Sequence, residues 1–221
     1  LASAGEAARA SLILLSLPTS EIAADVLEEI EAELKPGTII VDTTTGRPEQ
    51  MEAFAERLAR QDAAYLDATV GGSSQLTRDG EAILMCGGER IAFDRCEPLF
   101  DDLARKTFYC GPSGSGARMK LVVNLVLGLN RAVLAEGLSF ARQLGIDGGH
   151  ALEVLKAGAS WSRAMDHKGE KMLALDFEPQ ARLAQHFKDV RLILELAGQA
   201  KATVPFSSLH EKLLSRLVDQ G

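Results

Sequence analysis

Short apolar runs alternate with longer segments of helical periodicity through the first half of the chain. The first run, SLILLSLP, is continuously apolar and ends at a proline, which predicts a strand buried on both faces. The strand-like runs are residues 11–18, 38–45, 63–70, 81–88 and 106–111. The segments with helical spacing are residues 20–34, where Ser20 is a plausible N-cap, 48–61 and 89–104. This alternation predicts an open α/β sheet that is at least partly parallel.

The strand pattern stops after Gly111. Residues from Ser115 to about Leu144 form one long helical pattern, which a GID sequence ends. The later helical segments are residues 148–158, 162–173, 180–200 and 205–220. The pattern therefore predicts an α/β part followed by an all-α part, with the boundary near residues 111–116.

Composition narrows the possible classes of protein. Among 221 residues, 31 acids against 24 Lys and Arg give a formal charge of −7, which argues against a general nucleic-acid binder. The three cysteines are odd in number and lack the spacing of metal ligands or disulfide pairs, so we expect buried, reduced thiols. No uninterrupted apolar run reaches the length of a membrane-spanning helix, and no secretory signal is visible. We expect a cytoplasmic protein with no metal, nucleic-acid or membrane partner.

Ligands of open α/β sheets bind beyond the carboxyl ends of the strands. Three loops at such ends carry small or polar residues: 17–20, 42–48 and 67–80. The third contains Gly71, Gly72, Ser73 and Ser74 in succession, which offers backbone N–H groups and hydroxyls to an anion such as a carboxylate. Such a sequence is also typical of a plain flexible loop.

Lys120 and Asn124 are four residues apart in the long helix and therefore share one of its faces. A lysine in the first turns of a helix commonly extends to water along apolar neighbours. The functional interpretation is a partly desolvated lysine that donates or accepts a proton, with Asn124 holding a substrate oxygen. Lys188 and Asp189 form a second charged pair, which alone would be taken for a solvated helix face.

Five motifs together resemble the β-hydroxyacid dehydrogenase family, which includes 3-hydroxyisobutyrate dehydrogenase and tartronate semialdehyde reductase, with 6-phosphogluconate dehydrogenase as a distant relative. They occur in the family's order over essentially the whole chain. The motifs are LILLSLP, VDTTTGRP, DATVGGSSQLTRDGEAILMCGG, GPSGSGARMKLVVN and FKDVRLILELA. The resemblance implies a Rossmann-type dinucleotide-binding domain at residues 1–112, N-terminally incomplete, and an all-helical domain at residues 113–221, joined by a long interdomain helix.

The resemblance also assigns roles to residues. Lys120 would be the general acid and base. Gly71, Gly72, Ser73 and Asn124 would bind the substrate. The residues placed at an NAD or NADP cofactor are Leu17, Pro18, Thr45 and Lys188. The implied reaction interconverts a small 3-hydroxyacid and the corresponding aldehyde or keto acid, and relatives commonly form dimers through the helical half.

The chain departs from the family pattern at several positions. The family signature is Asp-Ala-Pro-Val-Ser-Gly-Gly. This chain has Thr69 in place of its Pro, Gly71 in place of its Ser, and Ser73 in place of its second Gly. No G-x-G-x-x-G follows a first strand, and the GPSGSG sequence opens the long helix instead. We therefore expect a fragment of a longer protein that binds dinucleotide poorly.

Two functions follow as hypotheses. The first is an NAD(P)-dependent oxidoreductase that acts on a small carboxylate. The second is a non-catalytic scaffold that retains the fold. The apolar stripes in DVRLILELA and LHEKLLSRLV mark either a core or the interface of a homodimer.

Overall fold

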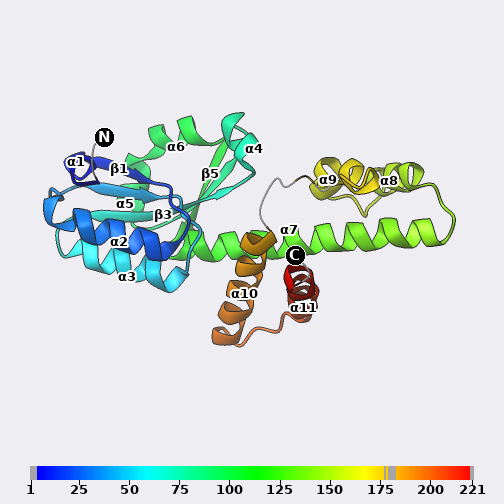
Figure 1. Ribbon diagram of the computed structural model, residues 1–221. Coiled ribbons are helices and arrows are strands. Elements are labelled where there is room, and N and C mark those ends of the chain that lie inside the picture. Colours follow the sequence, from blue (N-terminus) through cyan, green and yellow to red (C-terminus); the bar gives the residue numbers. More distant parts are fainter. Residues whose placement is uncertain (1–3, 177, 179–182, 220–221) are drawn as a thin grey trace. The chain divides into compact units, whose positions relative to one another are not determined.

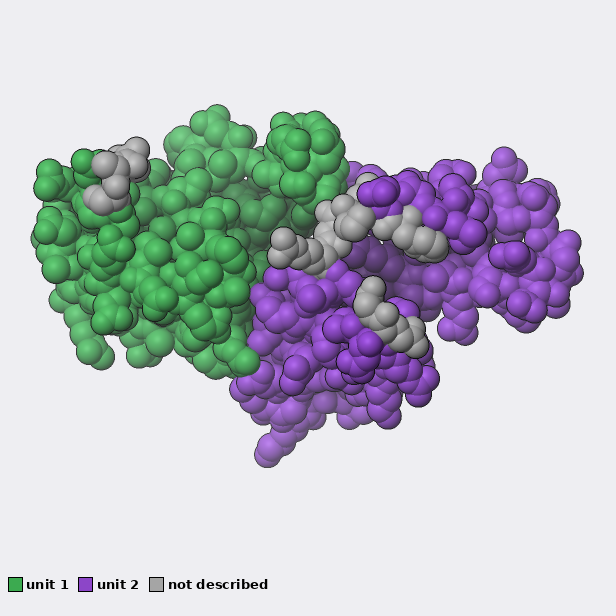
Figure 2. All heavy atoms as spheres, in the orientation of Figure 1, with its two compact units in different colours: residues 1–120 green, residues 121–221 purple. Residues whose placement is uncertain are grey.

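The computed structural model describes residues 4–176, 178 and 183–219 (Figure 1). The chain divides into two compact units, residues 1–120 and 121–221, which Figure 2 shows in different colours. Residues 180–182 and 220, at the ends of two expected helical segments, lie outside the described residues.

The first unit contains a five-stranded mixed sheet. Its strands are β1 (Leu12–Leu15), β2 (Ile39–Asp42), β3 (Ala64–Gly71), β4 (Ile83–Gly87) and β5 (Lys106–Gly111), in the order β1-β2-β3-β4-β5. β1, β2 and β3 are parallel, β4 runs antiparallel to β3, and β5 is parallel to β4. The predicted open, partly parallel α/β sheet is thus confirmed.

Helices cover both faces of this sheet. The helical segments of the first unit are α1 (Ala4–Ala7), α2 (Ser20–Ile30), η1 (Glu31–Glu33), α3 (Pro48–Ala59), α4 (Ser74–Arg78), α5 (Arg90–Arg95) and α6 (Glu97–Leu103). On one face, α2 and α3 bury Leu27 and Met51 against Ile13 and Ile40 of the sheet. On the other, α5 and α6 bury Phe93 and Phe100 against strand residues that include Leu66. The result is a three-layer arrangement with an apolar core on each side of the sheet.

Three local predictions were wrong. β1 is not buried on both faces: Leu12 and Leu14 are exposed, because β1 is an edge strand and α5 and α6 pack over the other strands. The N-cap of α2 is Thr19, whose hydroxyl accepts from the Ile22 N–H, while Ser20 is buried inside the helix. The single helix expected over residues 89–104 is two helices, which meet at Cys96.

The long helix α7 (Ser115–Gln143) confirms the prediction of one continuous helix in this region. Its residues up to Lys120 belong to the first unit and the rest to the second. The other helices of the second unit are α8 (Gly148–Ala157), α9 (Arg163–Leu173), α10 (Leu183–Gln199) and α11 (Pro205–Asp219). Leu134 and Leu138 of α7 pack against Leu152 and Met165 of α8 and α9, while Leu121 packs against α10.

Among the described helices, α7 is the one that is long and apolar enough to cross a membrane by length and composition. Its best 18-residue window has a mean hydropathy of 1.5, and 28% of that window is buried. The apolar run within this helix, LVVNLVLGLN, is too short by itself to predict a span, contains two Asn residues and is flanked by charged residues. Length and composition alone are weak support for a span, since the central helix of a globular protein meets the same test.

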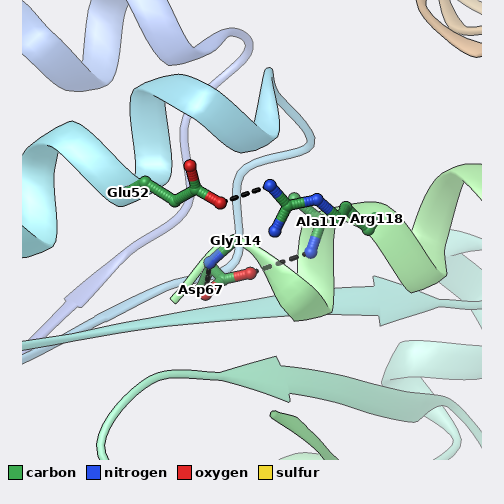
Figure 3. Close-up of polar contacts among 5 residues, drawn as sticks. All are labelled: Glu52, Asp67, Gly114, Ala117 and Arg118. Atoms are coloured by element: carbon green, nitrogen blue, oxygen red, sulfur yellow. Dashed lines mark hydrogen bonds and ion pairs between the residues drawn. The ribbon is translucent and has the colours of Figure 1, made fainter. Parts of the chain in front are cut away.

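A buried carboxylate connects β3 to the beginning of α7 (Figure 3). Asp67 is fully buried, and its two carboxylate oxygens accept hydrogen bonds of 2.8 Å from the N–H groups of Gly114 and Ala117. Burial raises the pKa of Asp67 to about 6, although these N–H groups act in the opposite direction. The close approach requires glycine at position 116, where a Cβ would overlap with the carbonyl oxygens of Asp67 and Met85.

The variant Gly116→Ala should therefore destabilise the protein. The overlapping atoms belong to the backbone and cannot rotate away, so we expect a loss of about 1–3 kcal/mol in the free energy of unfolding, measured with urea. Gly137→Ala in the same helix is the matched control, since nothing lies within 4 Å of a Cβ at that position. This control should gain up to about 1 kcal/mol from helix propensity, and equal effects of the two substitutions would contradict the packing described.

The titration of Asp67 gives a second prediction. Because its folded pKa lies above the unfolded value, Asp67 favours the folded state most below pH 4 and loses that contribution as pH rises through 6. The stability of wild type relative to Asp67→Asn should therefore fall by up to about 3 kcal/mol between pH 4 and pH 7. Urea unfolding of both proteins across this range measures the difference, and a constant difference would show that Asp67 does not titrate there.

Candidate functional site

The loops that follow β1 and β2 lie side by side at the carboxyl edge of the parallel strands. The Leu17 N–H donates to the Thr44 hydroxyl at 3.1 Å, which ties the two loops together. Leu17 and Thr45 are half-buried and Pro18 is exposed. The structure thus brings together three of the residues that the sequence assigned to the cofactor.

Asp42 shapes the second of these loops. It ends β2 and is fully buried, with one carboxylate oxygen accepting from the Thr44 N–H at 2.8 Å and the other from the Tyr65 hydroxyl at 2.7 Å. Burial raises the pKa of Asp42, while its hydrogen bonds lower it. A side chain that bonds the backbone two residues later fixes a tight turn, so Asp42 determines where Thr45 is presented.

The third loop differs from the flexible segment that the sequence allowed. Gly71 is the last residue of β3, Gly72 is exposed, and Ser73 is the N-cap of the short helix α4. The Ser73 hydroxyl accepts from the Leu76 N–H at 3.2 Å and retains its own proton for another acceptor. A Cβ at Gly71 would lie 2.8 Å from Cγ1 of Ile83, so a larger residue at that position would displace this side chain.

Lys120 and Asn124 lie one turn apart on α7, as predicted. Lys120 is half-buried and Asn124 is buried. Within the second unit, the Asn124 side-chain amide donates to the Asp189 carboxylate of α10 at 2.9 Å. This bond fixes the orientation of the amide and leaves its oxygen, a hydrogen-bond acceptor, for another group.

The charged pair on α10 is not a solvated helix face. Asp189 is 8% exposed, and Lys188 is half-buried with its ammonium nitrogen 3.8 Å from the other oxygen of the Asp189 carboxylate. In the sequence, Asp189 is recognisable only as the charged neighbour of Lys188, with no role of its own. An acidic residue within the apolar stripe of DVRLILELA is the signal that could have indicated its burial.

Burial favours the neutral form of two histidines in the second unit. The rings of His186 and His210 lie with centroids 5.2 Å apart and their planes tilted by 53°, beside Gly128 of α7. Burial lowers the pKa of His186 to about 4 and also lowers that of His210. Both rings are therefore neutral at pH 7 and contribute to packing.

The described residues contain neither a cluster of metal ligands nor an activated thiol. No group of three or more His, Cys, Asp or Glu suited to a metal ion occurs among residues 4–176, 178 and 183–219. Burial raises the pKa of all three cysteine thiols, which disfavours the reactive thiolate. Cys86 and Cys96 are buried as expected, and Cys110 is half-buried.

Asp67 and Thr69 are polar residues of β3 that sequence analysis did not select. Both are fully buried, and both bond to the first turn of α7, which is more than forty residues later in the chain. Thr69 was noted only as a departure from a family signature. Asp67 and Thr69 are two residues apart on a strand, so their side chains lie on the same face of the sheet. This spacing is the sequence feature that could have identified them as a pair.

Two family models together match nearly the whole chain. Residues 2–111 match the NAD binding domain of 6-phosphogluconate dehydrogenase, and residues 114–221 match a model described as NAD-binding of NADP-dependent 3-hydroxyisobutyrate dehydrogenase. Both describe regions that bind a nicotinamide cofactor, so NAD or NADP is the cofactor class of this family.

Curated relatives fall into two groups. The 2-hydroxy-3-oxopropionate reductase of Escherichia coli K12 is 30% identical over 191 residues, which are 86% of this chain and 65% of that protein. The cytokine-like nuclear factor N-PAC of Aedes aegypti is 31% identical over 168 residues, which are 76% of this chain and 30% of that protein. The chain thus spans less than two thirds of the length of either relative.

Solved structures agree on the fold. The 3-hydroxyisobutyrate dehydrogenase of Mycobacterium tuberculosis, solved with L-serine, superposes with a TM-score of 0.91 at 23% identity, covering 99% of this chain and 78% of that one. It shares the Rossmann-type α/β domain followed by a helical domain. The two family models and the similarity to the reductase show that the chain belongs to the β-hydroxyacid dehydrogenase family.

Proposed function

We propose that the complete gene product is an NAD(P)-dependent oxidoreductase that interconverts a small 3-hydroxyacid and the corresponding aldehyde or keto acid. The observation that carries the proposal is the pair Lys120 and Asn124, one turn apart on α7, in a chain matched by NAD-binding models along nearly its whole length. The substrates named for the relatives, 3-hydroxyisobutyrate and 2-hydroxy-3-oxopropionate, are both small carboxylates.

The residues at the carboxyl edge of the sheet suit the nicotinamide end of a cofactor. The joined loops present exposed Pro18 and half-buried Leu17 and Thr45, a small surface with both apolar and polar character. Lys188 would help to hold the cofactor. When bound, the nicotinamide supplies or accepts the hydride.

The chain itself supplies orientation and the proton. In the reducing direction, the Lys120 ammonium donates a proton to the carbonyl oxygen as negative charge develops there, and the resulting amine regains a proton from water. Asn124, oriented by Asp189, holds the substrate. The backbone N–H groups of Gly71 and Gly72 and the Ser73 hydroxyl bind its carboxylate.

The variant Lys120→Ala should lower kcat of the complete gene product by roughly 10²- to 10⁴-fold, the usual contribution of general acid–base catalysis. The control is Lys212→Ala on α11, an exposed lysine to which no role is given, which should leave turnover unchanged. Steady-state oxidation of 3-hydroxyisobutyrate and reduction of 2-hydroxy-3-oxopropionate provide the assays. Unchanged turnover in Lys120→Ala would exclude it as the general acid.

A non-catalytic scaffold is the second candidate, favoured by the similarity to N-PAC, whose name describes a nuclear factor. Titration of the protein with NADH and NADPH, followed by cofactor fluorescence, separates the two functions. Binding together with turnover supports the enzyme. Absence of binding by the complete gene product supports the scaffold.

The same proposal includes a homodimer formed through the helical unit. The stripe in DVRLILELA proves to be core, because Val190, Leu192 and Ile193 are buried. Among the described residues, apolar side chains of α7 are exposed at positions whose helical spacing places them on a single stripe. That exposed stripe comprises Val122, Val126, Val133 and Phe140, and α11 adds Leu209, Leu213 and Leu217. An apolar surface of this kind marks a protein interface.

Val133→Glu should disrupt this dimer, because it places a charge in the middle of the exposed stripe, where Val133 is 68% exposed. We expect wild type to sediment as a dimer at micromolar concentration and the variant as a monomer. Ser139→Glu is the matched control, since this exposed residue lies off the stripe, about 120° from Val133 around α7. A monomeric wild-type protein would refute the dimer.

A further inference from the structure

Two buried side chains of β3 hold the first turn of α7 at separate points. Asp67 accepts from the N–H groups of Gly114 and Ala117, both at 2.8 Å (Figure 3). The Thr69 hydroxyl lies 3.0 Å from the Gly116 carbonyl oxygen and 3.3 Å from that of Met85, and shares its proton between them. The carboxylate therefore holds N–H groups of the turn and the hydroxyl holds a carbonyl, so the contact resists both sliding and rotation.

Other contacts around this turn restrict it further. Gly116 packs directly against the backbone of β3 and β4, since a Cβ there would overlap with carbonyl oxygens of both strands. Arg118, in the next position but one, forms an ion pair with Glu52 of α3 (Figure 3). This pair is partly exposed and contributes little alone, so the buried bonds from β3 dominate.

The position of this turn determines the position of Lys120. Lys120 follows Gly116 by four residues, so it lies on the face of α7 that Gly116 turns toward β3, about 6 Å farther along the helix axis. A shift of one residue would rotate it by about 100°. β3 is also the strand that ends at Gly71, so both parts of the proposed site in this unit share one support.

We propose that Asp67 and Thr69 are positioning residues that fix the Lys120 ammonium relative to the carboxyl end of β3. This inference rests on the proposed function for its catalytic consequence. The effect of Asp67 and Thr69 on the position of Lys120 can be tested without enzyme activity, because neither residue is proposed to touch the substrate. Each acts through the backbone of α7.

The test uses Thr69→Val, which removes the hydroxyl and keeps the shape, Asp67→Asn, which removes the charge, and Thr69→Ser as the conservative variant. Acylation of lysines by limiting acetic anhydride, quantified by mass spectrometry at fixed pH, reports the environment of Lys120 without requiring turnover. We expect Thr69→Val and Asp67→Asn to change the acylation rate of Lys120 at least threefold. Thr69→Ser should keep the wild-type rate. Lys35, exposed in the same unit, serves as the internal control and should not change.

Kinetics then test the catalytic consequence. In Thr69→Val, kcat should fall about tenfold or more while KM for the cofactor stays within twofold, because misplacing a reacting group costs rate. Loss of thermal stability with an unchanged Lys120 acylation rate in both variants would overturn the inference and leave only a structural role. An inactive wild-type protein whose Lys120 rate still responds would refute the proposed function and retain the positioning role.

Discussion

The bond between the Asp67 carboxylate and the beginning of α7 is the interaction on which the arrangement of the first unit depends. The first N–H groups of any helix lack partners within the helix. Here a fully buried carboxylate satisfies those of Gly114 and Ala117, where the helix dipole also favours negative charge. Desolvation offsets part of this gain and raises the pKa of Asp67 to about 6. The bond therefore specifies position more than it adds stability.

That specificity matters because α7 belongs to both units of the chain. Its first turn is held by β3, and its later turns supply Leu121, Leu134 and Leu138 to the cores of the helical unit. Within one continuous helix, each residue is rotated by about 100° from the residue before it. Lys120, the last residue of the first unit, lies one turn after these contacts, so its position within that unit derives from them.

Local sequence patterns predicted most of the fold because the elements follow local rules. The described strands are short, mainly apolar runs, and Pro48 begins α3 at the first helical position, which proline favours. The wrong predictions arise where contacts with residues far away in the sequence determine the local structure. Ser20 looks like an N-cap but is buried, where its hydroxyl bonds to Gln50, thirty residues later. Thr19 takes the capping position instead.

In the candidate site, too, local sequence patterns do not reveal contacts between residues that are far apart in the sequence. Lys120 and Asn124 could be proposed from spacing alone, because both belong to one helix. Asp189 could not be assigned to Asn124, which lies 65 residues away in sequence. Thr69 was even harder to interpret, since a threonine in a strand is ordinary and its bond to Gly116 requires α7 to be in place. Long-range hydrogen bonds leave no periodic pattern in a sequence.

The buried polar groups also bear on the choice between enzyme and scaffold. Replacing a buried ionic or polar cluster by apolar residues is often neutral or stabilising, so such clusters add little to a fold required only as a platform. This chain buries Asp67, Asn124 and Asp189. Asn124 belongs to α7, the helix that carries Lys120, and the two aspartates accept hydrogen bonds from α7. A scaffold needs only the surface of α7, whereas proton transfer needs a lysine at a defined place. The cost of these buried groups is intelligible if that place is used, which favours the oxidoreductase.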